Sequence, residues 1–203
     1  TTSILRGLKE RYKNCRIDWV TKKESFDILK NNYFLDKTYI IDDALNKLKN
    51  KKYSLVICLD DGYEACELAA FVKSKKIIGS YLQDNQKSYT KGSSLWFDMG
   101  LISKLGKKKA DELKAKNRRT YQEIIYKILG LKYGKQEPIL TLNKNEIDFG
   151  KNFANNNKIK KTRAVIGINT GAGGRWKDKK LGIGETAEFI ENLSKEIKNS
   201  KII

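Results

Sequence analysis

The residues best suited to chemistry lie in one glycine-rich segment, Asn169-Thr170-Gly171-Ala172-Gly173-Gly174-Arg175-Trp176-Lys177-Asp178-Lys179-Lys180-Leu181. It follows an apolar run typical of a strand and precedes a helical pattern that begins at Ile183. A small-residue turn between a strand and a helix exposes backbone N–H groups, and basic side chains beside it add positive charge. We therefore expect a phosphate-binding turn. Its expected binding residues are Thr170, Gly171, Gly173, Gly174, Arg175 and Lys179.

Two known phosphate-binding motifs do not fit this segment. A Walker loop ends in Gly-Lys-Ser/Thr, which is missing here, and the Gly-x-Gly-x-x-Gly fingerprint does not occur in the required register. An ordinary glycine-rich turn with a solvated basic rim explains the same residues equally well. The residues of the segment leave both interpretations open.

The choice of acid–base and metal-binding groups is narrow, because the chain contains no histidine. A general base would have to be a carboxylate, a lysine or a tyrosine. Cys15, Cys58 and Cys66 have no metal-ligand spacing, so we expect no metal site, and three unpaired cysteines fit the reducing cytoplasm. Asp60 and Asp61 follow a buried apolar strand at its carboxyl end, where α/β folds bind ligands. Capping of the next helix by Asp61 is the favoured alternative.

Helical and strand patterns alternate along the chain, which predicts an α/β fold with a doubly wound, mostly parallel sheet. The polar residues 83–94 are expected to form a loop, and Asp42 to cap the helix that it begins. The expected strands are 16–20, 38–41, 53–59, 76–82 and 163–169. The expected helices are 3–12, 26–29, 42–49, 63–75, 95–105, 110–131 and 183–198.

The chain is expected to hold one domain and the start of another. Residues 1–142 form the first, residues 143–161, rich in Asn and Lys, form a linker, and residues 162–203 begin a second βαβ unit. The sequence starts without an initiator Met and stops as a strand begins at Lys201, so we interpret both ends as truncations.

The chain carries 42 Lys and Arg against 24 Asp and Glu, a net charge of +18 that favours anionic partners. A general bias of the composition toward Lys and Asn explains this charge equally well. The basic run between Lys104 and Arg119 has two interpretations, a surface facing phosphorylated lipid and an ordinary solvated helix face. No apolar run reaches about 18 residues, so no membrane span is expected.

The segment Asn169–Leu181 resembles the one that opens the donor domain of family 9 glycosyltransferases, the ADP-heptose lipopolysaccharide heptosyltransferases and their relatives. In that family a Gly-Ala-containing turn is followed by a Lys-Arg-Trp-Pro-like stretch and a helix. Lys179 matches the lysine of this motif and Lys180 its arginine, while Leu181 and Gly182 replace Trp and Pro. Other segments similar to the family follow in the same order, at 1–12, 15–20, 95–99 and 117–122.

The resemblance implies a GT-B architecture: a Rossmann-like N-terminal acceptor domain whose first strand is missing, plus the start of a Rossmann-like nucleotide-sugar domain. It implies inverting transfer of heptose from ADP-heptose to an anionic glycolipid of the lipopolysaccharide-core type, without metal or other cofactor. The enzyme would be cytoplasmic, with peripheral contact to the anionic inner face of the membrane.

The resemblance also implies roles for individual residues. Lys179 would approach the donor diphosphate, and the catalytic aspartate would lie upstream of Thr1. On the acceptor side, Thr1 or Thr2 would be the last residue of the family's Gly-Asp-containing turn. The aromatic pair Trp96 and Phe97 has two interpretations, a lining of the acceptor groove and a place in the core. Two alternatives stay open: a noncatalytic relative of the family, and a basic α/β protein that binds nucleic acid. The sequence has no recognisable nucleic-acid-binding motif, so no nucleic-acid partner is expected.

Overall fold

A computed structural model describes residues 1–159, 164–171 and 180–203. The chain divides into two compact units, Thr1–Thr141 (unit 1) and Leu142–Ile203 (unit 2), and each is described by itself. No helix in the described ranges has the length and apolar character needed to cross a membrane.

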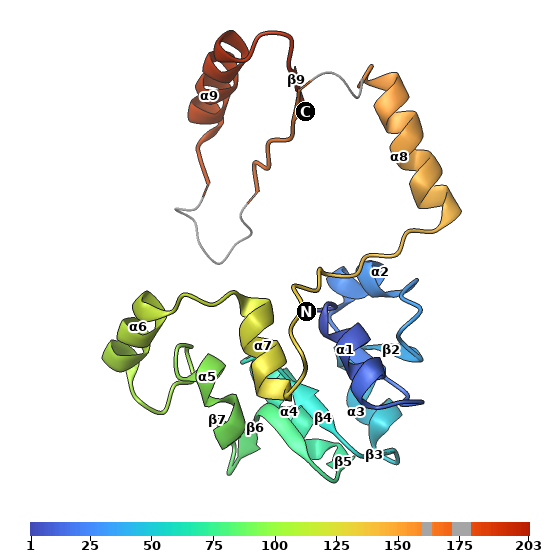
Figure 1. Cartoon of the computed structure of the whole chain (residues 1–203), viewed down its shortest axis with the longest axis vertical. Helices are drawn as coiled ribbons and strands as arrows, with labels where there is room; N and C mark the ends of the chain where they lie inside the picture. Colours follow the sequence, from blue (N-terminus) through green and yellow to red (C-terminus); the bar gives the residue numbers. More distant parts are fainter. Residues whose placement is uncertain (160–163, 172–179) are drawn as a thin grey trace. The chain divides into compact units, whose positions relative to one another are not determined.

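The strands of unit 1 pair mostly in parallel, as the alternating pattern predicts (Figure 1). The parallel pairs are β1 (Asp18–Thr21) with β2 (Lys37–Ile40), β3 (Lys52–Tyr53) with β5 (Lys73–Ser74), and β4 (Val56–Cys58) with β6 (Ile77–Gln83). One pair is antiparallel, β6 with β7 (Gln86–Tyr89).

Helices connect these strands and cover the sheets. They are α1 (Ile4–Arg11), α2 (Phe26–Leu29), α3 (Ile41–Leu48), α4 (Tyr63–Phe71), α5 (Ser94–Phe97), α6 (Lys107–Lys116) and α7 (Tyr121–Leu129). Short 3-10 turns, η1 (Lys23–Ser25) and η2 (Lys91–Ser93), precede α2 and α5.

One hydrophobic core cluster of unit 1 lies where α1 packs against α7. Ile4 and Leu8 of α1 contact Ile125, Tyr126 and Leu129 of α7 in one core cluster. The fully buried Tyr126 hydroxyl donates a hydrogen bond of 2.5 Å to the Ser3 carbonyl. A second cluster joins α3 to α4 through Ala44, Leu48, Leu68 and Val72. The first and last helices of unit 1 therefore share one core, although about 120 residues separate them in sequence.

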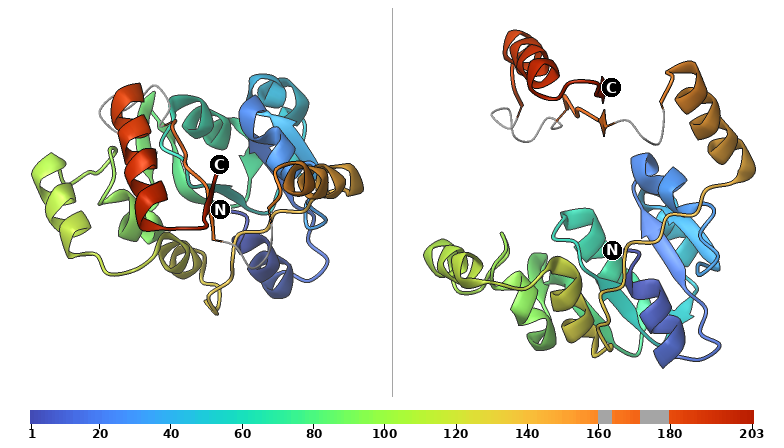
Figure 2. Two further views of the ribbon diagram at one scale, coloured as in Figure 1. Left: turned by 90° about the horizontal axis from the view of Figure 1, so that it is seen from above. Right: turned by 45° about the horizontal axis from the view of Figure 1, so that its top comes forward.

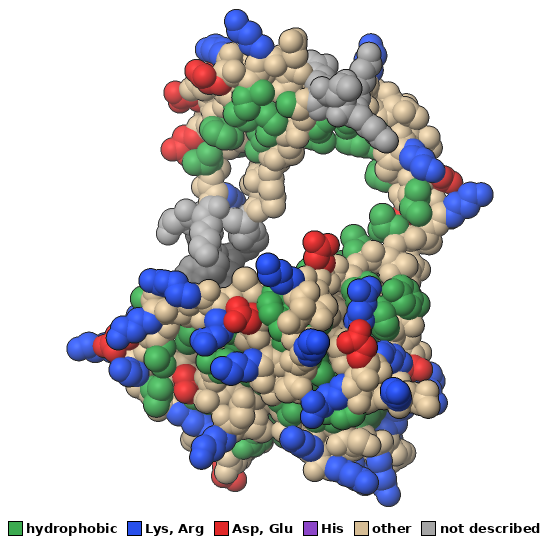
Figure 3. Space-filling view, viewed as in Figure 1, with side chains coloured by type: hydrophobic (Ala, Val, Ile, Leu, Met, Phe, Trp, Pro, Cys, Tyr) green, Lys and Arg blue, Asp and Glu red, His purple; other side chains and the backbone are tan. Residues whose placement is uncertain are grey.

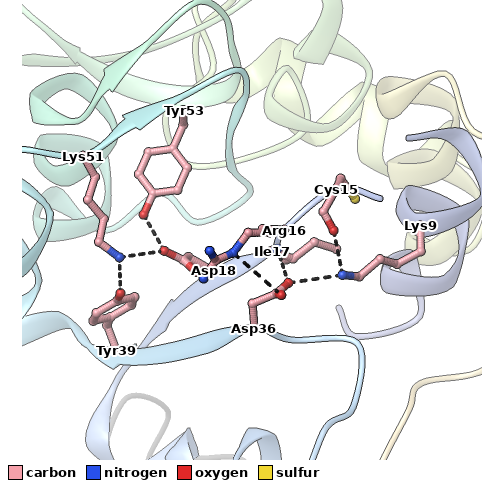
Figure 4. A network of polar contacts seen from close by, with 9 residues as sticks. All are labelled: Lys9, Cys15, Arg16, Ile17, Asp18, Asp36, Tyr39, Lys51 and Tyr53. Atoms are coloured by element: carbon pink, nitrogen blue, oxygen red, sulfur yellow. Dashed lines mark hydrogen bonds and ion pairs between the residues drawn. The ribbon is translucent and has the colours of Figure 1, made fainter. Parts of the chain in front are cut away.

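Hydrogen bonds and an ion pair connect β1, β2 and β3 (Figure 4). The Asp18 carboxylate accepts hydrogen bonds from Lys51 Nζ at 3.0 Å and from the Tyr53 hydroxyl at 2.6 Å, and Lys51 also reaches the Tyr39 hydroxyl. The bonds to Tyr39 and Asp18 raise the pKa of Lys51. Since only 11% of the Asp18 side chain is exposed, this carboxylate depends on its two donors.

A neighbouring carboxylate fixes the start of β2 to α1 and β1 (Figure 4). The Asp36 Oδ2 atom accepts hydrogen bonds from the Ile17 N–H at 2.7 Å and from Lys9 Nζ at 3.2 Å. These bonds, with the Ile17 N–H foremost, lower the pKa of Asp36 below its ordinary value.

Two predicted elements of unit 1 are each divided in the structure. The predicted strand 53–59 is two strands, β3 and β4, which pair with β5 and β6 respectively. The predicted helix 110–131 is α6 and α7, because Thr120 begins a new helix by accepting a hydrogen bond from the Glu123 N–H at 3.2 Å.

Other predictions were wrong as well. The end of the predicted helix 63–75 is the strand β5, because α4 ends at Phe71. The predicted loop 83–94 contains β7, because Asp84 and Asn85 adopt positive φ angles of 50° and 59° and form a two-residue hairpin turn. The predicted helix 95–105 is only α5, which ends at Phe97 and is followed by turns. Asp42 does not cap α3: Ile40 occupies the cap position, and Asp42 lies in the first turn.

Unit 2 contains α8 (Lys144–Asn156), β8 (Val165–Ile166), α9 (Ile183–Glu196) and β9 (Lys201–Ile202). Helix α8 occupies most of the predicted linker and begins with a capping box between Asn143 and Glu146. The chain passes from β8 through α9 to β9 (Figure 2). Strand β9 pairs with β8 in parallel, with Val165 opposite Lys201. This is the βαβ order that the sequence predicts.

Candidate functional site

The described part of the glycine-rich turn is open to solvent. Thr170 and Gly171 follow β8 at its carboxyl end, and both are exposed. Among residues 1–159, 164–171 and 180–203, a Cβ atom added at Gly171 would meet only the Asn169 Oδ1 atom, at 3.6 Å. Four residues of the predicted phosphate site lie outside the described residues: Gly173, Gly174, Arg175 and Lys179.

Two backbone N–H groups that flank this turn donate hydrogen bonds to side-chain oxygens. The Gly171 N–H donates to Asn169 Oδ1 at 2.9 Å, and the Gly182 N–H donates to Glu185 Oε2 at 2.8 Å. Gly182 precedes the first residue of α9, so the Glu185 carboxylate lies where the helix dipole favours negative charge. Both positions therefore bind an oxygen acceptor in the structure, although each acceptor belongs to the chain itself.

Four residues meet at the carboxyl end of β4, three of them predicted for the acceptor side. Tyr121, the first residue of α7, is half-buried, and its pKa is raised chiefly by burial. Thr1 and the Asp60 carboxylate lie close enough to the Tyr121 hydroxyl to shift this pKa as well. The Trp96 ring packs edge-on against the Tyr121 ring, with centroids 4.7 Å apart. We call Thr1, Asp60, Trp96 and Tyr121 the Tyr121 cluster.

The two aspartates after β4 make different contacts, and Asp61 does not cap the next helix as the favoured interpretation had it. Asp60 Oδ1 accepts a hydrogen bond from the Gly62 N–H at 2.7 Å, which fixes the turn that leads into α4. Asp61 does not cap α4, whose cap position is Gly62; its backbone carbonyl accepts a bond from Lys87 Nζ at 3.0 Å. The buried Ser80 hydroxyl binds the Asp60 carbonyl and so holds this turn to β6. The charge of the exposed Asp60 carboxylate raises the pKa of Tyr121, which links Asp60 electrostatically to the Tyr121 cluster.

Thr2 and Trp96 have structural contacts that the sequence did not reveal. The Thr2 side chain is buried and exchanges two hydrogen bonds with Ile139: its hydroxyl donates to the Ile139 carbonyl at 3.0 Å and accepts from the Ile139 N–H at 2.8 Å. The Thr2 hydroxyl is therefore both a donor and an acceptor to the same residue. Trp96 packs against the α1–α7 core cluster, so the alternative prediction that Trp96 belongs to the core is confirmed.

Two of the three cysteines are buried and poorly suited to act as nucleophiles. Cys15, Cys58 and Cys66 are free, and burial raises the pKa of the Cys58 and Cys66 thiols, which keeps both in the neutral form. In the described ranges no group of three or more His, Cys, Asp or Glu side chains is arranged to hold a metal ion.

Two solved structures with a similar fold are those of glycosyltransferases. One is the crystal structure of the glycosyl transferase family 9 from Veillonella parvula DSM 2008, which covers the whole of this chain with a TM-score of 0.61 and 13% sequence identity. The chain shares its fold with this family 9 enzyme. Another is the structure of E. coli ADP-heptose lps heptosyltransferase II, which covers 99% of the chain with a TM-score of 0.52 and 16% identity.

These comparisons confirm the predicted α/β fold of the GT-B type and the predicted likeness to family 9 structures. The chain spans 56% of the length of the first protein and 58% of the second. No protein-family model matches the sequence, and no curated protein matches it.

Proposed function

We propose that the chain is part of an inverting glycosyltransferase that transfers a sugar from a nucleoside diphosphate to an anionic glycolipid. The observation that carries this proposal is the likeness of fold to two glycosyltransferases along the whole chain. Heptose is the proposed sugar, ADP the proposed leaving group and a lipopolysaccharide core the proposed acceptor, because one of these structures is an ADP-heptose lps heptosyltransferase.

The proposed donor site is the turn between β8 and α9. It follows the carboxyl end of a parallel strand, the usual ligand-binding edge of an α/β sheet. The Gly171 and Gly182 N–H groups already donate to side-chain oxygens, and a diphosphate oxygen would replace Asn169 and Glu185 as their acceptor. The resemblance to family 9 implies that Lys179 supplies the positive charge that binds the diphosphate.

The proposed acceptor site is the Tyr121 cluster of unit 1. A carboxylate removes the proton from the acceptor hydroxyl, and the oxygen then attacks the anomeric carbon of the donor from the face opposite the diphosphate. The bond to the diphosphate breaks, and backbone N–H groups with Lys179 stabilise the negative charge that leaves. The proposal requires no metal ion or other cofactor.

The proposal includes a cytoplasmic location, which the three free thiols support. It includes peripheral contact with the membrane that would hold the glycolipid acceptor. A noncatalytic relative of the same fold is the alternative, and turnover measurements separate the two.

Donor binding is tested by thermal unfolding of the protein with ADP-, UDP- and GDP-sugars. A ligand at 100 times its dissociation constant stabilises the folded state by about 2.7 kcal/mol. We expect ADP-heptose to raise the melting temperature and Lys179→Ala to remove most of that rise. The matched control is Lys195→Ala, which removes the same charge from the last turn of α9. If no nucleotide sugar shifts the transition, or if both variants respond alike, the assigned donor site is wrong.

A further inference from the structure

The most basic part of unit 1 is the segment from Leu101 to Arg119, which contains α6. It has eight Lys and Arg against two Asp and Glu, a net charge of +6 within 19 residues, whereas the whole chain carries +18 within 203. A third of the net charge is thus concentrated in less than a tenth of the chain. A bias of composition alone would spread the charge evenly.

Much of this charge is not neutralised within the described structure. Lys109 pairs with Glu112 at 3.1 Å and Arg119 with Glu123 at 3.7 Å. Four other lysines of α6 are exposed and have no acidic partner in the described ranges: Lys107, Lys108, Lys114 and Lys116. Four ammonium groups on one ten-residue helix repel one another, and an anionic partner relieves that repulsion.

Exposed leucines precede these lysines. Leu101 is 74% exposed and Leu105 is 50% exposed, and both lie in the turns between α5 and α6. Single exposed leucines are common on proteins, but here two of them adjoin the most basic helix of the unit. Apolar side chains beside Lys-rich ones are typical of surfaces that lie at a membrane interface, where the apolar groups enter the acyl boundary and the lysines meet phosphates.

The position of α6 leaves this segment accessible. In α6 only Ala110 is buried, and the helix lies at the outer edge of unit 1, away from the sheets (Figures 1 and 2). Figure 3 shows Lys and Arg side chains gathered over the same edge. We define the α6 patch as Leu101, Leu105, Lys107, Lys108, Lys114 and Lys116.

We infer that the α6 patch docks the protein on an anionic lipid bilayer. The lysines complement the lipid phosphates, and the leucines distinguish this partner from a nucleic acid, which offers no apolar phase for them. The patch has no aromatic side chain, so it also lacks the stacking groups that single-stranded nucleic acids use. The inference rests on the membrane contact included in the proposed function and names the surface that makes it. Its test can fail separately from sugar transfer, because vesicle binding is measured without donor or acceptor.

Lysine near an anionic membrane strengthens binding by about fivefold per residue, so four lysines together give several hundredfold. The experiment measures co-sedimentation of the protein with vesicles of equal parts phosphatidylglycerol and phosphatidylcholine, and with phosphatidylcholine alone. We expect binding to the first vesicles only, and weaker binding at higher salt. The combined variant K107Q/K108Q/K114Q/K116Q should lose about a hundredfold or more in affinity.

The matched control removes the same number of charges from the exposed lysines around β3 and β5, in the variant K52Q/K73Q/K75Q/K76Q. It should keep its affinity within about fivefold, because distant charges are largely screened. A second variant, L101N/L105N, should weaken vesicle binding about tenfold or more, since each leucine loses its burial in the acyl boundary. Far-UV circular dichroism and melting temperatures establish that all variants are folded.

Three results would overturn the inference. Equal losses in the two lysine variants would show that bulk charge alone attracts the protein. Full vesicle binding by the α6 lysine variant would show that the patch is not the contact. Unchanged vesicle binding by L101N/L105N, together with duplex DNA displacing the protein from vesicles, would assign the basic helix to nucleic acid instead.

Discussion

Replacement of Thr2 by Val distinguishes a structural role for this residue from a role in binding the acceptor. The two side chains have nearly the same shape, but Val has no hydroxyl. The change removes both hydrogen bonds between Thr2 and Ile139 and leaves the Ile139 N–H and carbonyl groups without that partner. Thr2→Ser is the matched control, because it keeps the hydroxyl and loses only a methyl group.

The magnitude follows from the burial of the two residues. A buried polar group left without a partner costs about 1–3 kcal/mol, but Ile139 is only half-buried, so water replaces part of what is lost. We expect Thr2→Val to lower the free energy of unfolding of unit 1 by about 2 kcal/mol. In a domain of this size that corresponds to a fall in melting temperature of about 4–8 °C.

Urea unfolding of wild type, Thr2→Val and Thr2→Ser measures these free energies at equilibrium. Thr2→Ser should lie within about 1 kcal/mol of wild type, because its hydroxyl still bridges to Ile139. Equal stabilities for the Val and Ser variants would refute the structural role. If the Val variant had normal stability but a raised KM for the acceptor, Thr2 would instead belong to the acceptor site, as the sequence predicts.

Three other predictions concern the polar network and the Tyr121 cluster. Lys51→Met should lower the free energy of unfolding by about 1–2 kcal/mol. This is less than the roughly 3–5 kcal/mol lost when a fully buried ion pair is broken, because 35% of the lysine side chain is exposed. A double-mutant cycle with Asp18→Asn that gives no coupling energy would contradict this prediction. Because the folded pKa of Asp36 is lowered, its contribution is present above the ordinary value of 3.8 and is lost as pH falls through the folded pKa. The stability advantage of wild type over Asp36→Asn in urea should therefore shrink below about pH 4, and a constant difference would contradict the assigned bonds. Tyr121→Phe should raise the acceptor KM about fivefold with little change in melting temperature, whereas an unchanged KM would remove Tyr121 from the acceptor site.

Local patterns predicted most elements of the fold, because they depend on residues close in sequence. The alternation of apolar and polar residues predicted α1, α3, α4 and the βαβ order of unit 2. The missed hairpin also had a local signal: Asp84-Asn85 supplies the positive φ angles that a two-residue turn needs. Likewise, Thr120 followed three residues later by Glu123 is a helix-start signal within the predicted helix 110–131.

Other features of unit 1 had no local signal. The division of 53–59 into β3 and β4 depends on which strands each one pairs with, and the apolar run continues through the break. The Tyr121 cluster joins residues 1, 60, 96 and 121, and Thr2 binds Ile139 across 137 positions. Spacing within a sequence cannot show such contacts. The resemblance to family 9 predicted the architecture because it used the order of several weak segments along the whole chain.

The bonds that join the two ends of unit 1 have a consequence for how the chain folds. Thr2 binds Ile139, Ser3 binds Tyr126 and Arg11 binds Gly130. The buried core partners of Ile4 and Leu8 in α1 likewise belong to α7, beyond position 120. During synthesis the apolar face of α1 therefore stays partly uncovered until α7 has left the ribosome. Contacts of such long sequence separation slow folding, and they make a cooperative closure of the whole unit the last step in forming its core.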